Sequence, residues 1–193
     1  MDDIYIEGKT YDKHDIKANP LAKGEYENCS FTNCDFSNYD LSDYKFADCQ
    51  FTECNLSLIK LTKTAFRDVK FIYCKMLGLQ YENCRDMGLS FSFENCILNH
   101  SSFYKLKIKN TSFINSQLHE VDFSECDITG SLFDNCDLSG AVFDNTIIEK
   151  ADFRTSYNYT IDPEINRIRK ARFSTSGLWG LLGKYDIEIS DTP

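Results

Sequence analysis

The sequence has 193 residues, a length that suits one domain with a substantial core, and its 30 acidic residues against 21 lysines and arginines give a formal net charge of -9 at pH 7. This acidic balance argues against direct binding of nucleic acid or an anionic membrane and favours a basic protein partner. No run of about 18 apolar residues predicts a membrane helix, and the first residues lack a signal-peptide pattern, so we expect a cytoplasmic protein.

Residues 1–25 show no clear repeat, and we expect them to form an N-terminal cap. The alternation over Ile4, Tyr5 and Ile6 and the later Asn19-Pro20 pair predict a short strand and a turn. Together these would close the first coil of the repeat domain that follows.

A large apolar residue returns at every fifth position from Tyr26 to Tyr81. These residues, called centre positions below, are Tyr26, Phe31, Phe36, Leu41, Phe46, Phe51, Leu56, Leu61, Phe66, Phe71, Met76 and Tyr81. A period of five fits neither the 3.6-residue period of a helix nor the two-residue alternation of a strand, so it predicts short strands separated by turns. We expect the repeat domain to cover residues 26–158.

The register slips by two residues within residues 82–92, and the period resumes at Phe93 and continues to Phe153. A bulge, a bend of the rod or a contact loop would each absorb the two residues. Beyond the slip, residue types recur after 20 residues, in the series Phe93, Phe113, Phe133 and Phe153 and the series Ile108, Ile128 and Ile148. Four five-residue units per coil predict an all-β, four-sided parallel solenoid of about six coils.

Stacked columns 20 residues apart predict contacts between coils. Asn95, Asn115 and Asn135 would form an amide ladder. Opposite charges would stack in the pairs Asp40 and Lys60, Asp43 and Lys63, Lys105 and Glu125, Lys107 and Asp127, and Asp134 and Arg154.

All nine cysteines lie two residues before a centre position, at positions 29, 34, 49, 54, 74, 84, 96, 126 and 136. The slot is shared with serine, threonine and alanine, which favours an inward-pointing small apolar side chain. A disulfide or a metal site is the alternative, although the sequence has no Cys-x-x-Cys pair.

Residues 159–193 are expected to form a C-terminal cap. Asp162-Pro163-Glu164 predicts a helix start, a second short helix is predicted over residues 177–182, and residues 185–189 alternate like an edge strand. The apolar residues here would either cover the last coil or also pair two chains, and the candidates for dimerisation are Leu178, Trp179, Leu181, Leu182, Ile187 and Ile189.

No catalytic, phosphate-binding or zinc motif is present, and His14, His100 and His119 are far apart in the sequence. We therefore expect no enzyme, no cofactor and no metal. Residues 117–153 instead hold nine acids against the single base Lys150, which form either a solvated surface or a docking surface for a basic groove. The candidate binding residues are Glu120, Asp122, Glu125, Asp127, Asp134, Asp137, Asp144, Glu149 and Asp152. Bases cluster at residues 60–75 and 105–109.

Units such as Cys34-Asp35-Phe36 and Ala151-Asp152-Phe153 resemble the pentapeptide-repeat family over residues 26–153. That resemblance implies a right-handed quadrilateral β-helix. The tail from Asp162 to Ile168, with the apolar segment after it, resembles the Qnr and McbG (microcin B17 immunity) type. This implies a dimeric DNA mimic, whose acids stand in for phosphates on DNA gyrase or topoisomerase IV and protect the enzyme from a toxin or quinolone. The alternative is a scaffold for another protein partner.

Overall fold

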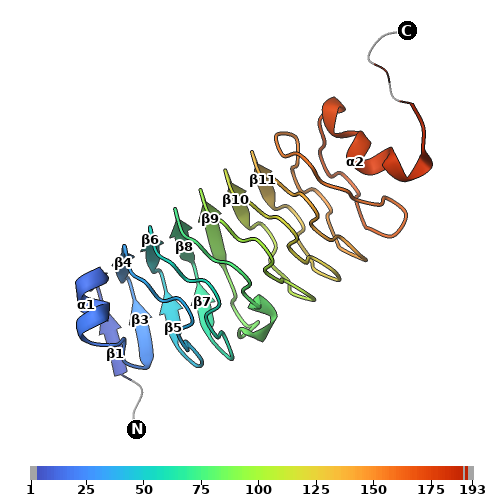
Figure 1. Cartoon of the computed structure of the whole chain (residues 1–193). Helices are drawn as coiled ribbons and strands as arrows, with labels where there is room; N and C mark the ends of the chain where they lie inside the picture. The colour runs from blue at the N-terminus through green and yellow to red at the C-terminus, as the bar shows by residue number, and fades with distance from the viewer. Residues whose placement is uncertain (1–3, 189, 191–193) are drawn as a thin grey trace.

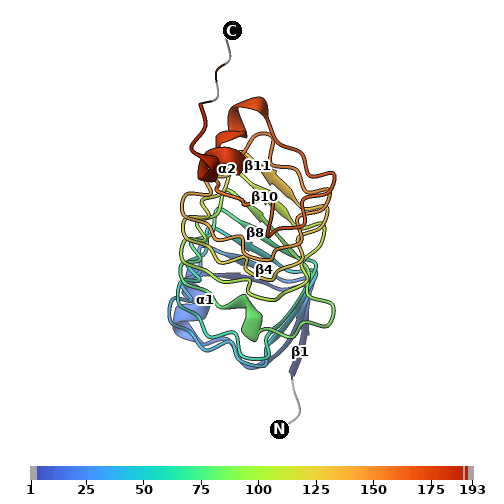
Figure 2. The ribbon, with the colours of Figure 1, turned by 90° about the vertical axis from the view of Figure 1, so that its right-hand side faces the viewer.

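Short parallel strands stack along one axis in the computed structural model, which describes residues 4–188 and 190 (Figure 1). The strands are β1 (Ile4–Glu7), β2 (Thr10–Asp12), β3 (Gly24–Glu27), β4 (Ser30–Thr32), β5 (Lys45–Ala47), β6 (Gln50–Thr52), β7 (Ala65–Arg67), β8 (Val69–Ile72), β9 (Phe91–Glu94), β10 (Ser112–Ile114) and β11 (Leu132–Asp134). Seen in the turned view, successive coils superimpose around a common interior (Figure 2). The predicted β-solenoid is confirmed.

The coil has four sides, which we number in chain order. Side 1 is the sheet β1-β3-β5-β7, and side 2 is the sheet of β2, β4, β6, β8, β9, β10 and β11. Side 3 has the centres Phe36, Leu56 and Leu98, and side 4 has Leu41, Leu61 and Phe103. Sides 3 and 4 are joined by single parallel bridges between coils, such as Asn55 with Lys75 and Asp122 with Val142.

Aromatic rings on side 2 form a continuous stack through the whole rod. Neighbouring rings lie 4.4 to 5.5 Å apart between centroids and are stacked, in the series Tyr11, Phe31, Phe51, Phe71, Phe93, Phe113, Phe133, Phe153 and Phe173. Rings on other sides meet this stack edge-on, as Phe46 of side 1 meets Phe51 at an interplanar angle of 73° and Phe123 of side 4 meets Phe113 at 87°. Each such pair adds about 1 kcal/mol to the burial of its surface.

The slot two residues before a centre often holds Cys, Ser or Thr, whose side chain points inward and donates a hydrogen bond, although Val121 and Ala151 also fill it. Cys54 Sγ donates to the carbonyl of Phe31 at 3.4 Å, and Ser156 Oγ donates to the carbonyl of Phe133 at 2.8 Å. All nine cysteines are buried and free, so the packing interpretation is the one that the structure supports. The slot therefore satisfies a carbonyl of the preceding coil as well as filling space.

Each corner is made by a residue two positions after the centre, in the left-handed conformation. The non-glycine residues with positive φ have values from 50° to 65°, and Asn is the commonest among them. Asn tolerates this conformation best after glycine, which explains why it recurs at corner positions.

The stack begins earlier than residue 26. β1 pairs with β3 and β2 with β4 at the same 20-residue offset, so Ile6, Tyr11, Ile16 and Leu21 take centre positions in a first coil. On side 3 of this coil the strand is replaced by α1 (Lys13–Ala18), which Asp12 caps by accepting hydrogen bonds from the backbone at residues 14 and 15. The strand predicted over residues 4–6 is present, whereas β2 and α1 were not predicted.

The two extra residues lie in a short loop, residues 84–90, which takes the place of side 1 in its coil. Pairs that span it are 22 residues apart, such as Val69 with Phe91, while pairs on either side of it keep the spacing of 20. The loop follows a single 3-10 turn, η1 (Tyr81–Asn83), and the rod continues past it without a break (Figure 1). The register slip is therefore a local bulge.

The predicted helix at Asp162 is absent. Asp162 does accept a hydrogen bond from the Glu164 backbone at 2.9 Å, but only a turn follows, because the chain returns to the coil. Asn166 fills an inner slot and donates to the carbonyl of Phe143 at 2.9 Å, while Ile168 packs against the core.

The chain then leaves the coil and forms the cap, with η2 (Thr175–Gly177), α2 (Trp179–Leu182) and η3 (Gly183–Tyr185). The second predicted helix is thus confirmed. Residues 186–188 form no strand with the described part of the chain, and Ile189 lies outside the described residues. None of the helices within residues 4–188 has the length and apolar run needed to cross a bilayer.

The predicted contacts between coils are confirmed in part. Asn135 donates to Asn115 at 2.9 Å, and ion pairs join Lys60 to Asp40 at 3.7 Å and Lys105 to Glu125 at 3.5 Å. The other three charge pairs are wrong, because a nearer partner is available in each case. Asp43 pairs with Lys23, Asp127 with Lys109, and Arg154 with Asp152.

Candidate binding surfaces

The nine predicted acidic residues are spread over all four sides of the rod. Asp122, Glu125 and Asp144 lie on side 4, and Glu120 lies at the corner that leads to it. Asp137 lies on side 3, Asp127 and Glu149 on side 1, and Asp134 and Asp152 on side 2. The structure brings together only the four residues of the first group, which we call the side-4 strip.

Six of the nine carboxylates have a cationic or histidine partner, several of them in the neighbouring coil. The pairs are His100 with Glu120 at 3.2 Å, Lys105 with Glu125 at 3.5 Å, Lys109 with Asp127 at 3.0 Å, His119 with Asp137 at 2.9 Å, Arg167 with Glu149 at 2.7 Å, and Arg154 with Asp152 at 2.8 Å. Within the described residues, Asp122, Asp134 and Asp144 have no ion pair. The negative surface is therefore weaker than the nine acids alone indicate.

Three of the carboxylates have structural hydrogen bonds that hold them ionised. Burial works to raise the pKa of Asp137, but hydrogen bonds from Ser139, Asn158 and His119 outweigh it and lower the pKa to about 2. Asp127 is also buried, and hydrogen bonds from Thr129 and Lys109 still lower its pKa. The hydrogen bond from Arg154 lowers the pKa of Asp152, against an opposing effect of burial. These three residues hold turns in place as well as contributing charge.

The cap residues fall into two groups. Leu181 packs against the core, and Leu178 and Leu182 are half-buried, whereas Trp179 and Ile187 are 54% and 45% exposed. The cap approaches the rod through glycine, since a Cβ on Gly180 would lie 2.3 Å from the carbonyl oxygen of Tyr159. Covering the last coil therefore uses only part of the apolar surface of the cap.

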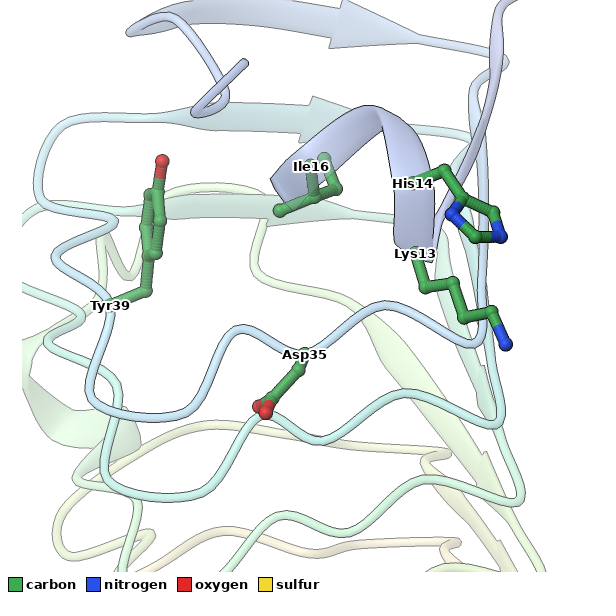
Figure 3. Close-up of a pocket in the computed structure, with 5 residues that line it drawn as sticks. All are labelled: Lys13, His14, Ile16, Asp35 and Tyr39. Carbon is green, nitrogen blue, oxygen red and sulfur yellow. The ribbon is translucent and has the colours of Figure 1, made fainter. Parts of the chain in front are cut away.

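A groove lies between α1 and the coil below it, with a volume of about 540 Å³ (Figure 3). Ile16 projects from α1 toward Tyr39, while Lys13 and His14 lie at the other side of the helix. Asp35 lines the groove from the coil below and accepts a hydrogen bond from the Ser37 backbone at 3.0 Å. The groove gathers no set of side chains that indicates a reaction.

The three histidines have separate surroundings. His14 lines the groove at the N-terminal end, and His100 and His119 each face a carboxylate one coil further on. Across the part of the chain that the structure describes, no three His, Cys, Asp or Glu side chains converge as metal ligands.

Sequence reasoning missed two sets of residues on these surfaces. The first is Arg167 and Arg172, which pair with Glu149 and Asp152 in the coil before them. Asn166 and Ala171, each two residues before an apolar centre, are the sequence signal that the coil continues after Phe153. The exposed bases around the bulge were noted only as a cluster in the sequence, because the path of residues 82–92 was needed to place them.

The family model described as the pentapeptide repeat region matches residues 25–92 and 89–157. Two structures of QnrB1, a plasmid-mediated fluoroquinolone resistance protein, superimpose on the whole rod. A trypsin-treated variant has a TM-score of 0.58 at 17% identity, and the match covers 97% of this chain and 99% of the variant. The full-length form has a TM-score of 0.51 at 18% identity, and the match covers 96% of this chain and 98% of that form.

HetL from the cyanobacterium Nostoc sp. strain PCC 7120, a pentapeptide repeat protein involved in heterocyst differentiation regulation, has a TM-score of 0.52 at 11% identity. It covers 89% of this chain and 85% of its own. No curated protein sequence matches the chain. At these identities the likeness to the solved structures is one of fold.

Proposed function

This chain belongs to the pentapeptide-repeat family, whose right-handed quadrilateral β-helix it adopts, and from that premise we propose that it is a cytoplasmic, non-enzymatic DNA mimic that binds a type II topoisomerase. Bound there, it would protect DNA gyrase or topoisomerase IV from a toxin or a quinolone. The alternative is a scaffold for a different protein partner, since the same rod also resembles HetL, a pentapeptide repeat protein involved in heterocyst differentiation regulation.

The side-4 strip is the observation that carries this proposal. Glu120, Glu125 and Asp144 are exposed, and Asp122 lies among them. Glu120, Asp122 and Glu125 belong to one coil and Asp144 to the next, so the rod holds four carboxylates close together on a rigid support. A fixed group of carboxylates resembles the dense negative charge of a nucleic acid backbone. The match of the rod from end to end with a fluoroquinolone resistance protein adds support.

Supercoiling by purified gyrase, with rising amounts of this protein and with or without a quinolone, tests the proposal. We expect inhibition or drug protection that weakens as salt is added, because charges on exposed surfaces are screened by salt. The triple variant Glu120→Lys, Glu125→Lys, Asp144→Lys should lose the effect. The control Asp48→Lys, Glu53→Lys, Glu94→Lys changes the charge equally at exposed sites away from the strip and should keep it.

No effect at a large excess of protein, or an equal loss in both triple variants, would refute the mimicry. The same preparations are measured by light scattering, because the proposal includes two chains paired through Leu178, Trp179, Leu182 and Ile187. A mass equal to one chain at the assay concentration would exclude the dimer from the proposal, and the gyrase assay would still test the binding.

A further inference from the structure

The bulge at residues 84–90 presents an exposed apolar side chain on side 1 of the rod. Its two ends are fixed to the coil before it, since Arg85 N donates to the carbonyl of Thr64 at 2.8 Å and Ser90 N donates to that of Phe66 at 3.0 Å. Between these anchors Met87 is 81% exposed, more than any other large apolar side chain in the described residues. A fixed loop that exposes methionine is suited to contact with another molecule.

Five bases lie on the bulge or beside it, and we call them the basic belt: Lys63, Arg67, Arg85, Lys105 and Lys107. Lys63 and Arg67 lie on the coil before the bulge, and Lys105 and Lys107 lie on the coil after it. The loop rests on one of them, since a Cβ on Gly88 would lie 3.5 Å from Arg67 Nε. Because successive coils are held in register, the belt is a rigid array.

Much of the charge of the belt is unpaired within the described residues. Arg85 lies 3.9 Å from Asp43, and Lys105 lies 3.5 Å from Glu125. Lys63, Arg67 and Lys107 have no ion pair there, and all three are exposed. Lys63 lies within electrostatic reach of Asp43, and an anionic group from a partner would meet Arg67 and Lys107 without a paired acid in the described part of the chain.

A small hollow beside the bulge supplies an apolar contact. Its volume is about 130 Å³, and it is lined by Leu89 and Leu106 with Lys105, Lys107 and Asp86 around them. Leu106 is buried at its floor. This space accepts one apolar side chain, and the two lysines stand where carboxylates beside that side chain would lie.

We propose that the basic belt is a docking surface for an acidic protein segment that carries an apolar anchor residue. The cations of the belt fit the carboxylates of such a segment, and the hollow and Met87 fit its apolar side chain. The phosphates of a nucleic acid would leave the hollow and Met87 without an apolar contact. The formal charge of -9 on the whole chain further disfavours nucleic acid. This surface meets the side-4 strip only at the ion pair of Lys105 with Glu125, and its exposed cations Lys63, Arg67 and Lys107 lie outside the strip, so the proposal stands whether or not a topoisomerase binds there.

The probe is a fluorescein-labelled peptide of repeated Asp-Glu-Leu, followed by fluorescence anisotropy with the full chain. Three other probes define the chemistry: the same peptide with Ser for Leu, the same peptide with Asn and Gln for the acids, and a DNA duplex of similar length. We expect the acidic, leucine-containing peptide to bind most tightly and to weaken as salt is added.

Two charge-reversed variants of equal net charge locate the binding. Lys63→Glu, Arg67→Glu, Lys107→Glu should weaken it by about tenfold or more, whereas Lys150→Glu, Arg169→Glu, Lys170→Glu, at exposed sites near the C-terminal end, should change it little. Met87→Ser, which leaves every charge in place, should reduce the preference for leucine over serine.

Equal loss in both triple variants would refute the belt, as would binding of the duplex as tight as that of the peptide. Absence of binding by the acidic, leucine-containing peptide up to the solubility limit of the protein would refute it too. Circular dichroism of each variant should match that of the parent chain, because the substituted side chains are exposed.

Discussion

The coils before and after the bulge share one skeleton but differ in the chemistry of their inner slots. Along the column between sides 2 and 3, the slots before the bulge hold Cys34, Cys54 and Cys74, while those after it alternate between thiol and hydroxyl, in the order Cys96, Ser116, Cys136 and Ser156. Four of the thiols donate to a carbonyl of the preceding coil at 3.3 to 3.7 Å, and Ser156 does so at 2.8 Å, whereas Ser116 donates to Ile114 in its own coil at 2.9 Å. This column therefore accepts a small donor of either chemistry.

The outward surfaces of the same two regions differ more. The basic belt lies around the bulge, and the side-4 strip lies on the coils that follow, although both rest on identical five-residue sides. Outward positions contribute little to the core, so their charge is free to vary without changing the fold. The comparison teaches that the interior specifies the rod and the exterior specifies its partners.

The largest expected effect tests whether the two regions share one core. Phe51 before the bulge and Phe113 after it are both fully buried and each stacks on a ring in both neighbouring coils, at 4.5 and 5.3 Å for Phe51 and at 5.1 and 4.8 Å for Phe113. Phe51→Ala and Phe113→Ala should each lower the free energy of unfolding by about 4 kcal/mol. Urea unfolding followed by circular dichroism measures the free energy of unfolding of both variants. A difference between the two losses of half that size would show that the two regions do not share one core.

A smaller effect should separate the two regions by pH. Asp137 accepts hydrogen bonds from Ser139 and Asn158, and its pKa falls from 3.8 to about 2. A lowered pKa stabilises the fold above pH 4, and this contribution disappears as the pH falls through 2. Asp137→Asn should therefore cost at most about 2 kcal/mol at neutral pH and nothing near pH 2.

Asp35 occupies the equivalent outward position before the bulge but is exposed, so water weakens its interactions. Asp35→Asn should cost clearly less than Asp137→Asn in the same urea titrations at neutral pH. A cost of Asp137→Asn that is equal at pH 7 and pH 2.5 would show that the carboxylate charge has no part in stability.

The core was predictable because inward residues recur in columns, and the columns follow from counting by 20. The ends were harder. Ile6, Tyr11, Ile16 and Leu21 keep the period of five, but they stand in a polar, helix-interrupted segment where the slot residues are not small. At the other end, Asp162 begins a turn with the hydrogen bond of a helix start, and the burial of later residues in the coil overrides the helix.

The surfaces were less predictable than the core. Nine acids that are close in sequence reach four different sides because each five-residue unit turns the chain by a quarter of a coil. The pairing of Glu149 and Asp152 depended in part on Arg167 and Arg172, which lie beyond the expected end of the repeat. The basic belt depends on the bulge, whose path no periodicity specifies. Charge on a solenoid is therefore readable from sequence only after every column has been assigned.

The smallest effect decides what the inner slot requires. Cys54→Ala and Cys54→Ser both remove the sulfur, but only serine keeps a donor for the carbonyl of Phe31, which accepts from Cys54 Sγ at 3.4 Å. If the slot needs only a small apolar group, alanine should be the more stable variant, because it buries no hydroxyl. If the slot needs a donor, as Ser156 in the same column indicates, serine should be more stable than alanine by about 1 kcal/mol. Urea midpoints of the two variants give the order directly, and alanine above serine would show that the hydroxyl slots after the bulge follow a different rule from the thiol slots before it.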